Sequence, residues 1–346
     1  MRPTVITSEL LAQGEIIRQP VGFEKGYWVG APGVFYAEDE KALYLTYRIR
    51  RPRGVAPDRG GEARIARSTD LRHFEDVWSV TKEQFSTASM ERCAIRKGPS
   101  GQWHYFTSYV DPADGRWCVS MIKAPRLSDL DAANAERLFS AEPLGLEGIK
   151  DPWVLETADG FKMFLSVALQ TDRTRKESHD TLDIFNTGEC VSATGLATSP
   201  DLEHWQWQGV VFEPSGSGWD AYCRRINCVL MGKAFYDGSG SELENYEERT
   251  GLADYHDYFG NWESLTVSAP LFASPHASGS LRYLDALIVN GELMMFYEFA
   301  RPDGAHDLRI LKVNEAEAVF RPPPSPDAVR LPNGASGLFD SSGPRP

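Results

Sequence analysis

The apolar positions of this chain fall into short runs that recur in pairs separated by a tight turn. The runs are rich in Val, Ile, Phe, Tyr and Trp, which favour strands, and the turns "ADG", "PSG" and "NG" are typical of β-hairpins. Five such hairpins follow one another: "APGVFYAEDEKALYLTYR", "RCAIRKGPSGQWHYFTSY", "DPWVLETADGFKMFLSV", "INCVLMGKAFYDG" and "LDALIVNGELMMFYEF". The pattern predicts an all-β protein.

A second motif recurs with the hairpins and consists of a strand, Ala-x-Ser, a turn residue, Asp-Leu and x-His-aromatic. It is clear in "RIARSTDLRHFEDV" (64–77) and "GLATSPDLEHWQWQG" (195–209), weaker at 251–265 and diverged at 121–138. Hairpin and motif together supply four strands and recur at a spacing of roughly 50–65 residues. Five four-stranded units indicate a five-bladed β-propeller around a central channel, because radial repetition protects strand edges. A large irregular β-sandwich is the alternative.

The two ends of the chain have separate expected roles. The last repeat lacks a fourth strand, and "GEIIRQPVGF" (14–23) is expected to supply it and close the ring. We therefore expect one propeller domain over 1–320. Residues 321–346 are rich in Pro, Gly and Ser and form a tail that cannot bury much apolar surface.

Composition narrows the class of protein. The 346 residues are 42% hydrophobic and carry a net charge of -13, which argues against nucleic-acid binding. No run reaches the roughly 18 apolar residues of a membrane span, and the start "MRPTVITSELLAQGE" lacks the apolar core of a secretory signal. The five cysteines are odd in number and without a CxxC pair, which favours reduced thiols and a cytoplasmic location.

Charged residues recur where each inner strand begins. In a propeller these positions, and the ends of the second strands, face one mouth of the channel. Four repeats carry charge there, and one such residue alone is usually structural, but four in register favour a functional site. The blade starts are Gly30-Ala31-Pro32, Glu91-Arg92, Asp151-Pro152, Arg224-Arg225 and Arg282-Tyr283-Leu284-Asp285, and the strand ends include Arg48, Asp237 and Glu298.

These repeats, the "DPWV…DGFKMFLS" unit and the closing "RYLDALIVNGELMMFYE" resemble the five-bladed propeller glycosidases. That group includes glycoside hydrolase families 43, 32, 62, 117 and 130, and the resemblance covers about Tyr27 to Val313. It implies that carboxylates from different blades converge on a sugar at the channel mouth. Cleavage of a glycosidic bond needs two carboxyl groups in different protonation states.

This sequence matches the family 43 pattern at one of its three catalytic positions and differs from it at the other two. Asp151 matches the Asp-Pro of the third blade, where family 43 enzymes have an orienting, pKa-tuning aspartate. The family's general base in blade one is replaced by Ala31, and the acid in blade four falls at Arg224-Arg225. Family 130 works with a single key aspartate in an Asp-Pro motif. It includes phosphorylases, in which basic residues bind the inorganic phosphate that replaces water.

The candidate site follows from these positions. We expect acid/base chemistry from Asp151, Glu91 and Asp285. The neighbouring arginines have two open interpretations: a site for an anionic group, since guanidinium forks bind anions bidentately, or a buried ionic lattice with the carboxylates. These arginines are Arg48, Arg92, Arg224, Arg225 and Arg282. Further candidate substrate contacts are Glu298, Tyr283, Trp28, Tyr222 and His306.

No metal site or cofactor is expected, although the resembling family 43 enzymes often hold a channel ion near a fifth-blade histidine, the place of His306. The leading hypothesis is a glycoside hydrolase-like enzyme that acts on a small carbohydrate, with anionic sugars among the candidate substrates. The alternatives are a glycoside phosphorylase and a sugar-binding or biosynthetic propeller that has lost catalytic carboxylates. We expect neither nucleic acid nor membrane as a partner.

Overall fold

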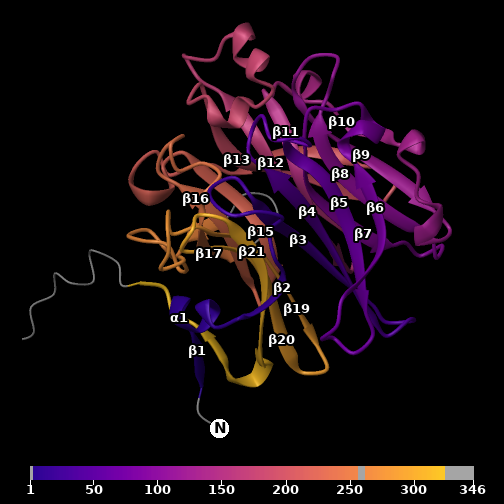
Figure 1. Cartoon of the computed structure of the whole chain (residues 1–346), viewed down its shortest axis with the longest axis vertical. Coiled ribbons are helices and arrows are strands. Elements are labelled where there is room, and N and C mark those ends of the chain that lie inside the picture. The colour runs from indigo at the N-terminus through magenta and orange to yellow at the C-terminus, as the bar shows by residue number, and fades with distance from the viewer. Residues whose placement is uncertain (1–2, 256–261, 324–346) are drawn as a thin grey trace, which may run out of the picture.

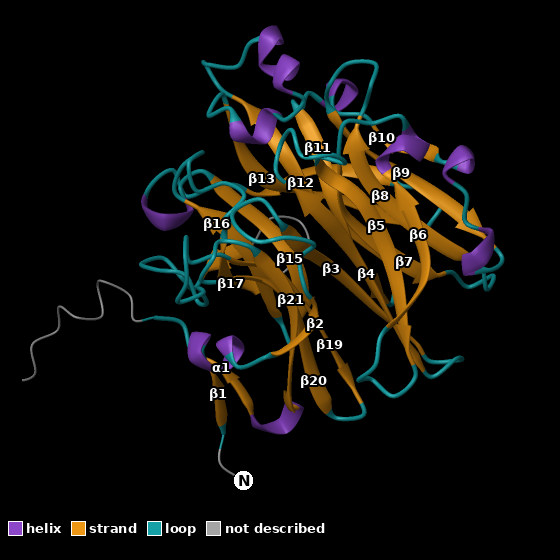
Figure 2. Ribbon diagram, in the orientation of Figure 1, coloured by secondary structure: helices purple, strands orange, loops and turns teal. Residues whose placement is uncertain are grey.

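Strands make up nearly all the regular structure of this protein (Figure 2). The computed structural model describes residues 3–255 and 262–323. Its strands form five antiparallel four-stranded blades. Blade one consists of β3 (Trp28–Ala37), β4 (Ala42–Arg51), β5 (Arg59–Ser68) and β6 (Glu75–Thr81). Blade two consists of β7 (Met90–Lys97), β8 (Trp103–Val110), β9 (Trp117–Ala124) and β10 (Glu136–Phe139).

The remaining three blades repeat this order. Blade three consists of β11 (Gly148–Thr157), β12 (Gly160–Gln170), β13 (Cys190–Ser199) and β14 (Gln206–Phe212). Blade four consists of β15 (Cys223–Leu230), β16 (Lys233–Ser239), β17 (Arg249–Tyr255) and β18 (Trp262–Ser264). Blade five consists of β19 (Leu281–Val289), β20 (Glu292–Ala300), β21 (His306–Asn314) and β2 (Glu15–Arg18). The predicted five-bladed propeller is confirmed.

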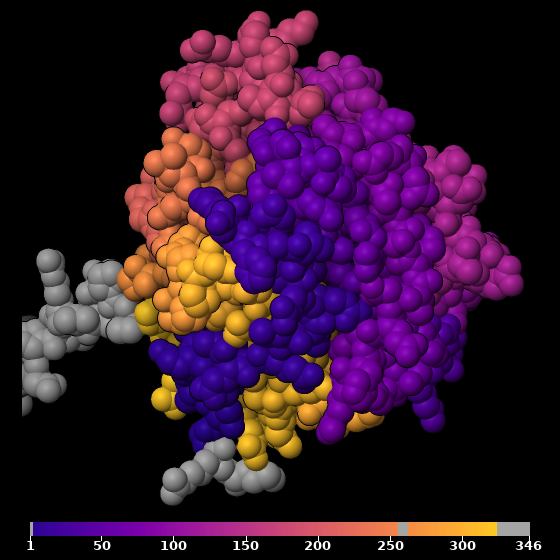
Figure 3. Space-filling model, in the orientation of Figure 1, coloured from indigo at the N-terminus to yellow at the C-terminus, as the bar shows by residue number. Residues whose placement is uncertain are grey.

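The two ends of the chain meet at blade five. β2 pairs antiparallel with β21, so the N-terminal strand closes the last blade as predicted. β1 (Thr4–Ile6) also pairs in parallel with β22 (Ala318–Phe320). Figures 1 and 3 show this contact as indigo chain beside yellow chain. Most of the predicted tail, residues 324–346, lies outside the described residues.

The helices are short and lie between strands. The α-helix α1 spans Ser8–Ala12, and Thr7 caps it by accepting a hydrogen bond from the Leu10 N–H. The 3₁₀ helices are η1 (Lys82–Phe85), η2 (Leu127–Asp129), η3 (Ala132–Asn134), η4 (Glu142–Leu144), η5 (Lys176–Thr181), η6 (Ile184–Asn186), η7 (Gly218–Asp220) and η8 (Glu315–Glu317). Within 3–255 and 262–323, no helix has the length and apolar character needed to cross a membrane.

The core lies between the faces of adjacent blades. Inner and second strands are buried on both sides, and every residue of β8 is buried, because each blade is covered by its two neighbours. This explains the nearly continuous apolar runs in the sequence. Single parallel residue pairs link neighbouring blades, namely Ser192 with Cys223, Arg249 with Leu281, and His306 with Trp28.

The recurring Ser-x-Asp-Leu-x-His motif is a polar turn between the third and fourth strands. In blade one, Asp70 accepts hydrogen bonds from the backbone N–H of His73 at 2.8 Å and from Ser68 Oγ at 3.0 Å. In blade three, Asp201 accepts them from the N–H of His204 at 2.9 Å and from Ser199 Oγ at 3.2 Å. The repeat that revealed the fold is therefore a structural device.

Candidate active site

A β-bulge at the start of every inner strand builds the site. The strand register shifts between Gly30 and Gly33, Met90 and Cys93, Lys150 and Trp153, Ile226 and Cys228, and Arg282 and Asp285. A bulge inserts an extra residue and bends the strand, which turns side chains toward a new direction. The five strand starts thereby carry equivalent bulges, one from each blade.

The bulges correct the sequence alignment of blade four. Arg225 pairs with Asp237 and Cys228 with Phe235, just as Arg282 pairs with Glu298 and Asp285 with Phe296. Arg225 is therefore the equivalent of Arg282, and the residue equivalent to Asp151 is Ile226, not an arginine. Blade four still places no carboxylate at the bulge.

Arg224 does not join the other predicted arginines. Its guanidinium pairs with Asp220 at 2.7 Å and lies over the rings of Phe212 in blade three and Tyr236 in blade four. The alternation of a strand explains this, because neighbouring side chains point to opposite faces.

Three bulge residues adopt a left-handed backbone that is costly for residues other than glycine. The φ angles are 51° for Ala31, 55° for Asp151 and 52° for Tyr283. In each case a side chain from the second strand of the preceding blade accepts the hydrogen bond of the bulge N–H. The pairs are Ala31 N–H to Glu298 at 3.1 Å, Asp151 N–H to Ser108 at 3.2 Å and Tyr283 N–H to Asp237 at 3.0 Å.

A chain of buried ion pairs runs from blade two to blade four through blades one and five. The carboxylates Glu91, Glu248 and Glu298 are 5%, 1% and 0% exposed. The ion pairs are Glu91–Arg48 at 3.2 Å, Arg48–Glu298 at 3.3 Å, Glu298–Arg282 at 2.7 Å, Arg282–Glu248 at 2.7 Å and Glu248–Arg225 at 2.9 Å. Burial alone would raise the pKa of these carboxyl groups, but the neighbouring arginines outweigh it and lower all three pKa values. All three are ionised at neutral pH, which supports the ionic-lattice interpretation of these arginines.

Asp151 differs from the lattice carboxylates because one of its oxygens accepts no hydrogen bond from any described residue. Its Oδ1 accepts a hydrogen bond from the Arg92 N–H at 3.3 Å, whereas Oδ2 accepts none from any described residue. The nearest cation is Lys150, with Nζ 3.4 Å from Oδ2. Lys150 Nζ also lies over the rings of Trp117 at 5.0 Å and Phe185 at 4.9 Å. A carboxylate oxygen that accepts no hydrogen bond, in a residue that is only 2% exposed, is an expensive arrangement.

Asp285, by contrast, is fully engaged. It accepts hydrogen bonds from the Val34 N–H at 2.8 Å and Trp153 Nε1 at 2.9 Å, and it pairs with Arg92 at 3.3 Å. Arg92 in turn donates to the Pro32 carbonyl at 2.8 Å. These contacts join four blades and favour a structural role for Asp285 and Arg92.

Sequence reasoning marked Asp237 only as a polar strand end. Burial and the adjacent Glu248 raise its pKa to about 8, so it carries a proton at neutral pH. The sequence patterns also gave no sign of Lys150 and Glu248 as site residues. Lys150 stands directly before Asp151, which was a usable signal, whereas Glu248 lies in a connection without a repeat pattern.

The other predicted contacts surround the lattice. The rings of Trp28 and His306 stack with their centroids 4.6 Å apart, and the Arg282 guanidinium carbon lies 4.8 Å from the centroid of the Trp28 indole. His306 Nδ1 is 2.8 Å from Glu298. The Tyr283 hydroxyl donates to Glu91 at 3.4 Å. Across 3–255 and 262–323, no group of three or more His, Cys, Asp or Glu side chains is arranged to hold a metal ion.

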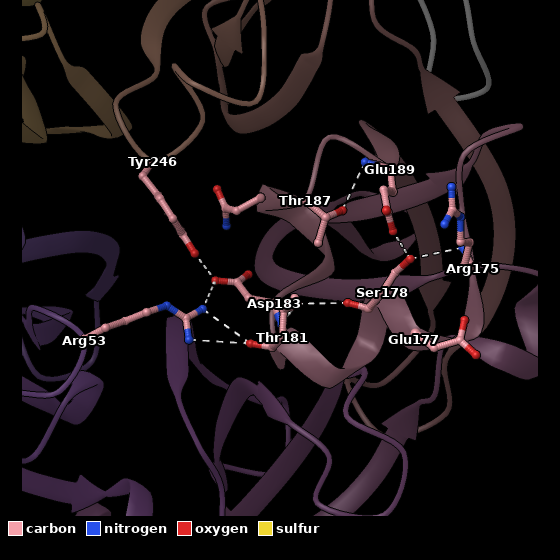
Figure 4. Close-up of a pocket in the computed structure, with 10 residues that line it drawn as sticks. Arg53, Arg175, Glu177, Ser178, Thr181, Asp183, Thr187, Glu189 and Tyr246 are labelled. Carbon is pink, nitrogen blue, oxygen red and sulfur yellow. Dashed lines mark hydrogen bonds and ion pairs between the residues drawn. The ribbon is translucent and has the colours of Figure 1, made fainter.

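Loops from several blades form a roof over this cluster. Asp183, between η5 and η6, pairs with Arg53 at 3.3 Å and Arg59 at 3.4 Å and accepts a hydrogen bond from the Tyr246 hydroxyl. Figure 4 shows Arg53 and Tyr246 converging on Asp183. These residues line part of a pocket of about 820 Å³ on the outer side of the roof. Tyr222 holds the roof from below, because its hydroxyl donates to the Phe185 carbonyl at 2.8 Å.

Known structures share this architecture at low sequence identity. Beta-1,2-mannobiose phosphorylase from Listeria innocua, in complex with beta-1,2-mannobiose, has a TM-score of 0.56 and 14% identity over 87% of this chain and 93% of its own. A thermostable family-43 glycoside hydrolase has a TM-score of 0.57 and 14% identity over 86% and 96%. The GH43_1 enzyme from Xanthomonas citri complexed with xylotriose has a TM-score of 0.57 and 12% identity over 88% and 92%.

The fold is therefore the five-bladed propeller found in these carbohydrate-active enzymes. No protein-family model matches the sequence, and no curated protein matches it either.

Proposed function

We propose that this protein is a carbohydrate-active enzyme that cleaves a glycosidic bond at the channel mouth, with Asp151 as the carboxylate that acts on the substrate. The observation that carries the proposal is the buried Oδ2 of Asp151, which accepts no hydrogen bond from any described residue and belongs to a residue on a left-handed bulge. Backbone strain and an unsatisfied polar atom concentrate at functional sites. The shared fold supports this assignment, since hydrolases and a phosphorylase use it.

Glu91 is the best second carboxylate. Arg48 keeps it ionised, and the Tyr283 hydroxyl bonds to it at 3.4 Å. An ionised carboxylate suits the activation of water or the stabilisation of positive charge on the sugar. Glu298 and Asp285 are engaged on both oxygens, so in this proposal they position other groups and do not touch the sugar.

Phosphorolysis is the second candidate, and a specific observation favours it. Arg48 Nη1 has no hydrogen-bond partner among the described residues, and Lys150 Nζ lies beside Asp151. Both are cations with donors to spare, which suits an anionic co-substrate. In this version inorganic phosphate replaces water: its oxygen bonds to the anomeric carbon, the glycosidic C–O bond breaks, and the proton lost by the hydrogen phosphate ends on the leaving alcohol oxygen.

The test is a screen of oligosaccharides, including β-1,2-mannobiose and xylotriose, with and without inorganic phosphate. We expect Asp151→Asn to lower turnover by about 10²–10⁴-fold, as is typical for loss of acid/base catalysis. Asp159→Asn, in the exposed turn of the same blade, is the matched control and should keep full activity.

Circular dichroism and melting would verify that both variants are folded. Full turnover by Asp151→Asn contradicts the proposal. Sugar-phosphate product that requires phosphate selects phosphorolysis over hydrolysis. Ligand-induced shifts in melting temperature without product would instead favour a non-catalytic sugar-binding propeller.

A further inference from the structure

The proposed reactive group is closed off from solvent. Asp151 and Lys150 are each 2% exposed, and Glu91 is 5% exposed. A sugar ring needs direct contact with the carboxylate that acts on it, with reacting atoms about 3–3.5 Å apart. The closed arrangement therefore has to open before a substrate can reach Asp151.

Residues 171–189 form the part of the roof that lies directly on the cluster. The Phe185 ring of η6 is 4.9 Å from Lys150 Nζ and 5.2 Å from the Arg225 guanidinium carbon. The Phe185 carbonyl accepts hydrogen bonds from the Tyr222 hydroxyl at 2.8 Å and from Asn245 Nδ2 at 2.7 Å. The Phe185 ring therefore covers Lys150 and Arg225.

The same segment is the longest of the five connections between second and third strands. The others span 52–58, 111–116, 240–248 and 301–305. Its regular structure consists only of the short helices η5 and η6, so few backbone hydrogen bonds tie it to the blade sheet. A segment of this kind opens more readily than a strand.

Asp183 carries the ion pairs between the segment and blade one and contacts two further blades, beside the contacts made by Phe185. It is 3% exposed and pairs with Arg53 and Arg59 of blade one. It accepts hydrogen bonds from the Tyr246 hydroxyl of blade four and, at 3.4 Å, from Trp117 Nε1 of blade two. One carboxylate thus joins blade three to three others.

We propose that residues 171–189 form a lid over the active site and that Asp183 is its latch. The role in admitting substrate rests on the proposed function. Arg53 and Tyr246 line the outer pocket beside Asp183 (Figure 4). A polyhydroxylated substrate in that pocket can engage both groups in place of Asp183 and release the lid.

The chain contains its own reporter of lid opening. Cys190 begins β13 directly after the lid, is 1% exposed and donates its thiol hydrogen to the Ile184 carbonyl at 3.3 Å. Burial raises its pKa to about 12, so the closed lid protects it from thiol reagents. Cys93 is an internal reference, because it lies in blade two and bonds to Tyr105.

The experiment is maleimide labelling of the whole protein at one pH, with each cysteine followed by mass spectrometry. Asp183→Asn removes the charge of the latch and should increase the labelling rate of Cys190 about 10-fold or more, since charged hydrogen bonds are the strong ones. Asp180→Asn is the matched control, an exposed aspartate in the same segment, and should leave the rate unchanged. The rate at Cys93 should stay constant in both.

Tyr246→Phe provides a second variant that keeps every ion pair of the latch and removes one hydrogen bond. It should raise the Cys190 rate by a smaller factor, a few-fold. The lid proposal is overturned if neither variant changes the Cys190 rate, or if Cys93 accelerates as much as Cys190, which would indicate general unfolding.

This measurement needs no substrate. An inactive protein with a fast-labelling Asp183→Asn variant would reject the proposed function and keep the lid. An active enzyme whose Cys190 rate is insensitive to both variants would reject the lid and keep the function.

Discussion

Blades one and three share the same local backbone and differ in chemistry. Ala31-Pro32 and Asp151-Pro152 occupy equivalent bulges, with φ angles of 51° and 55°. We call the side chain that accepts the hydrogen bond of the bulge N–H its cap. In blade one the cap is Glu298, whose carboxylate also pairs with Arg48, Arg282 and His306. In blade three the cap is the neutral Ser108, and the carboxylate is on the bulge itself.

The comparison separates the backbone device from its chemical use. The bulge persists with alanine or aspartate, since the hydrogen bond from the preceding blade holds it in both cases. Among the described residues, however, only blade three presents a buried carboxylate oxygen that accepts no hydrogen bond. Removing the caps tests whether the hydrogen bond from the preceding blade holds the bulge. Changing the bulge residues tests whether they decide its chemistry.

The largest expected effect comes from Glu298→Ala. This change removes the cap of Ala31 and leaves two buried arginines without their shared carboxylate. We expect a loss of about 3–5 kcal/mol in the free energy of unfolding, the usual result of breaking a buried ion pair. Denaturant unfolding measures it, with Glu38→Ala in the exposed turn of blade one as the control. A loss as small as that of Glu38→Ala would contradict the ionic lattice.

A smaller effect is expected from Ser108→Ala in blade two. The Asp151 N–H then loses its acceptor inside the protein, which costs about 1–3 kcal/mol. Unfolding by denaturant gives the stability, and Ser128→Ala at an exposed position is the control. Under the proposed function the turnover should fall as well, because the bulge carries Asp151. Unchanged stability would show that the cap does not hold the bulge.

A pH-dependent effect is expected at Asp237, the cap of Tyr283. Its pKa is raised to about 8 in the folded protein, so between pH 4 and 8 the folded state binds one proton more than the unfolded state. This contribution to stability is complete below pH 4 and is lost as the pH rises through about 8. Asparagine stays neutral at every pH, so the melting temperature of the wild type should fall relative to that of Asp237→Asn from pH 5 to pH 9. A difference that is constant with pH would contradict the protonated state.

The smallest effect is expected from Ala31→Gly. Glycine adopts a positive φ without strain, but it also loses more backbone entropy on folding and removes a buried methyl group. These terms oppose one another, so the free energy of unfolding should change by less than about 1 kcal/mol. Thermal melting checks this, and a large loss would mean that the methyl group of Ala31, which is fully buried, stabilises the mouth by packing.

The architecture was readable from local patterns. The hairpins and the Ser-x-Asp-Leu-x-His turns follow from residues close together in sequence. The strand at 15–18 was predicted from the missing fourth strand of the last repeat, although it pairs with residues 308–310 at the other end of the blades. The site was readable only in part. The position of Asp151 followed from the repeat. Which of its oxygens accepts a hydrogen bond depends on blade two, because the backbone N–H of Arg92 donates to Oδ1 and leaves Oδ2 without one.

Blade four shows why the alignment failed by one residue. A bulge leaves no distinct mark in the run "CRRINC", so Arg224 and Arg225 both qualified as the first residue. Strand alternation then sends Arg225 into the lattice and Arg224 to Asp220. Asp183 of the lid and its partner Tyr246 of blade four had no repeat pattern at all, since they lie in connections whose conformation is set by contacts between blades.

The sequence by itself determined the five blades, their order and the charged residues at their inner ends, because periodicity and turn chemistry act over a few neighbouring residues. The tertiary structure alone decided which of those charges are paired, which oxygen of Asp151 accepts no hydrogen bond and which connection lies over the cluster. Pairing and burial depend on the convergence of distant blades, and a carboxylate acquires its chemistry from those neighbours.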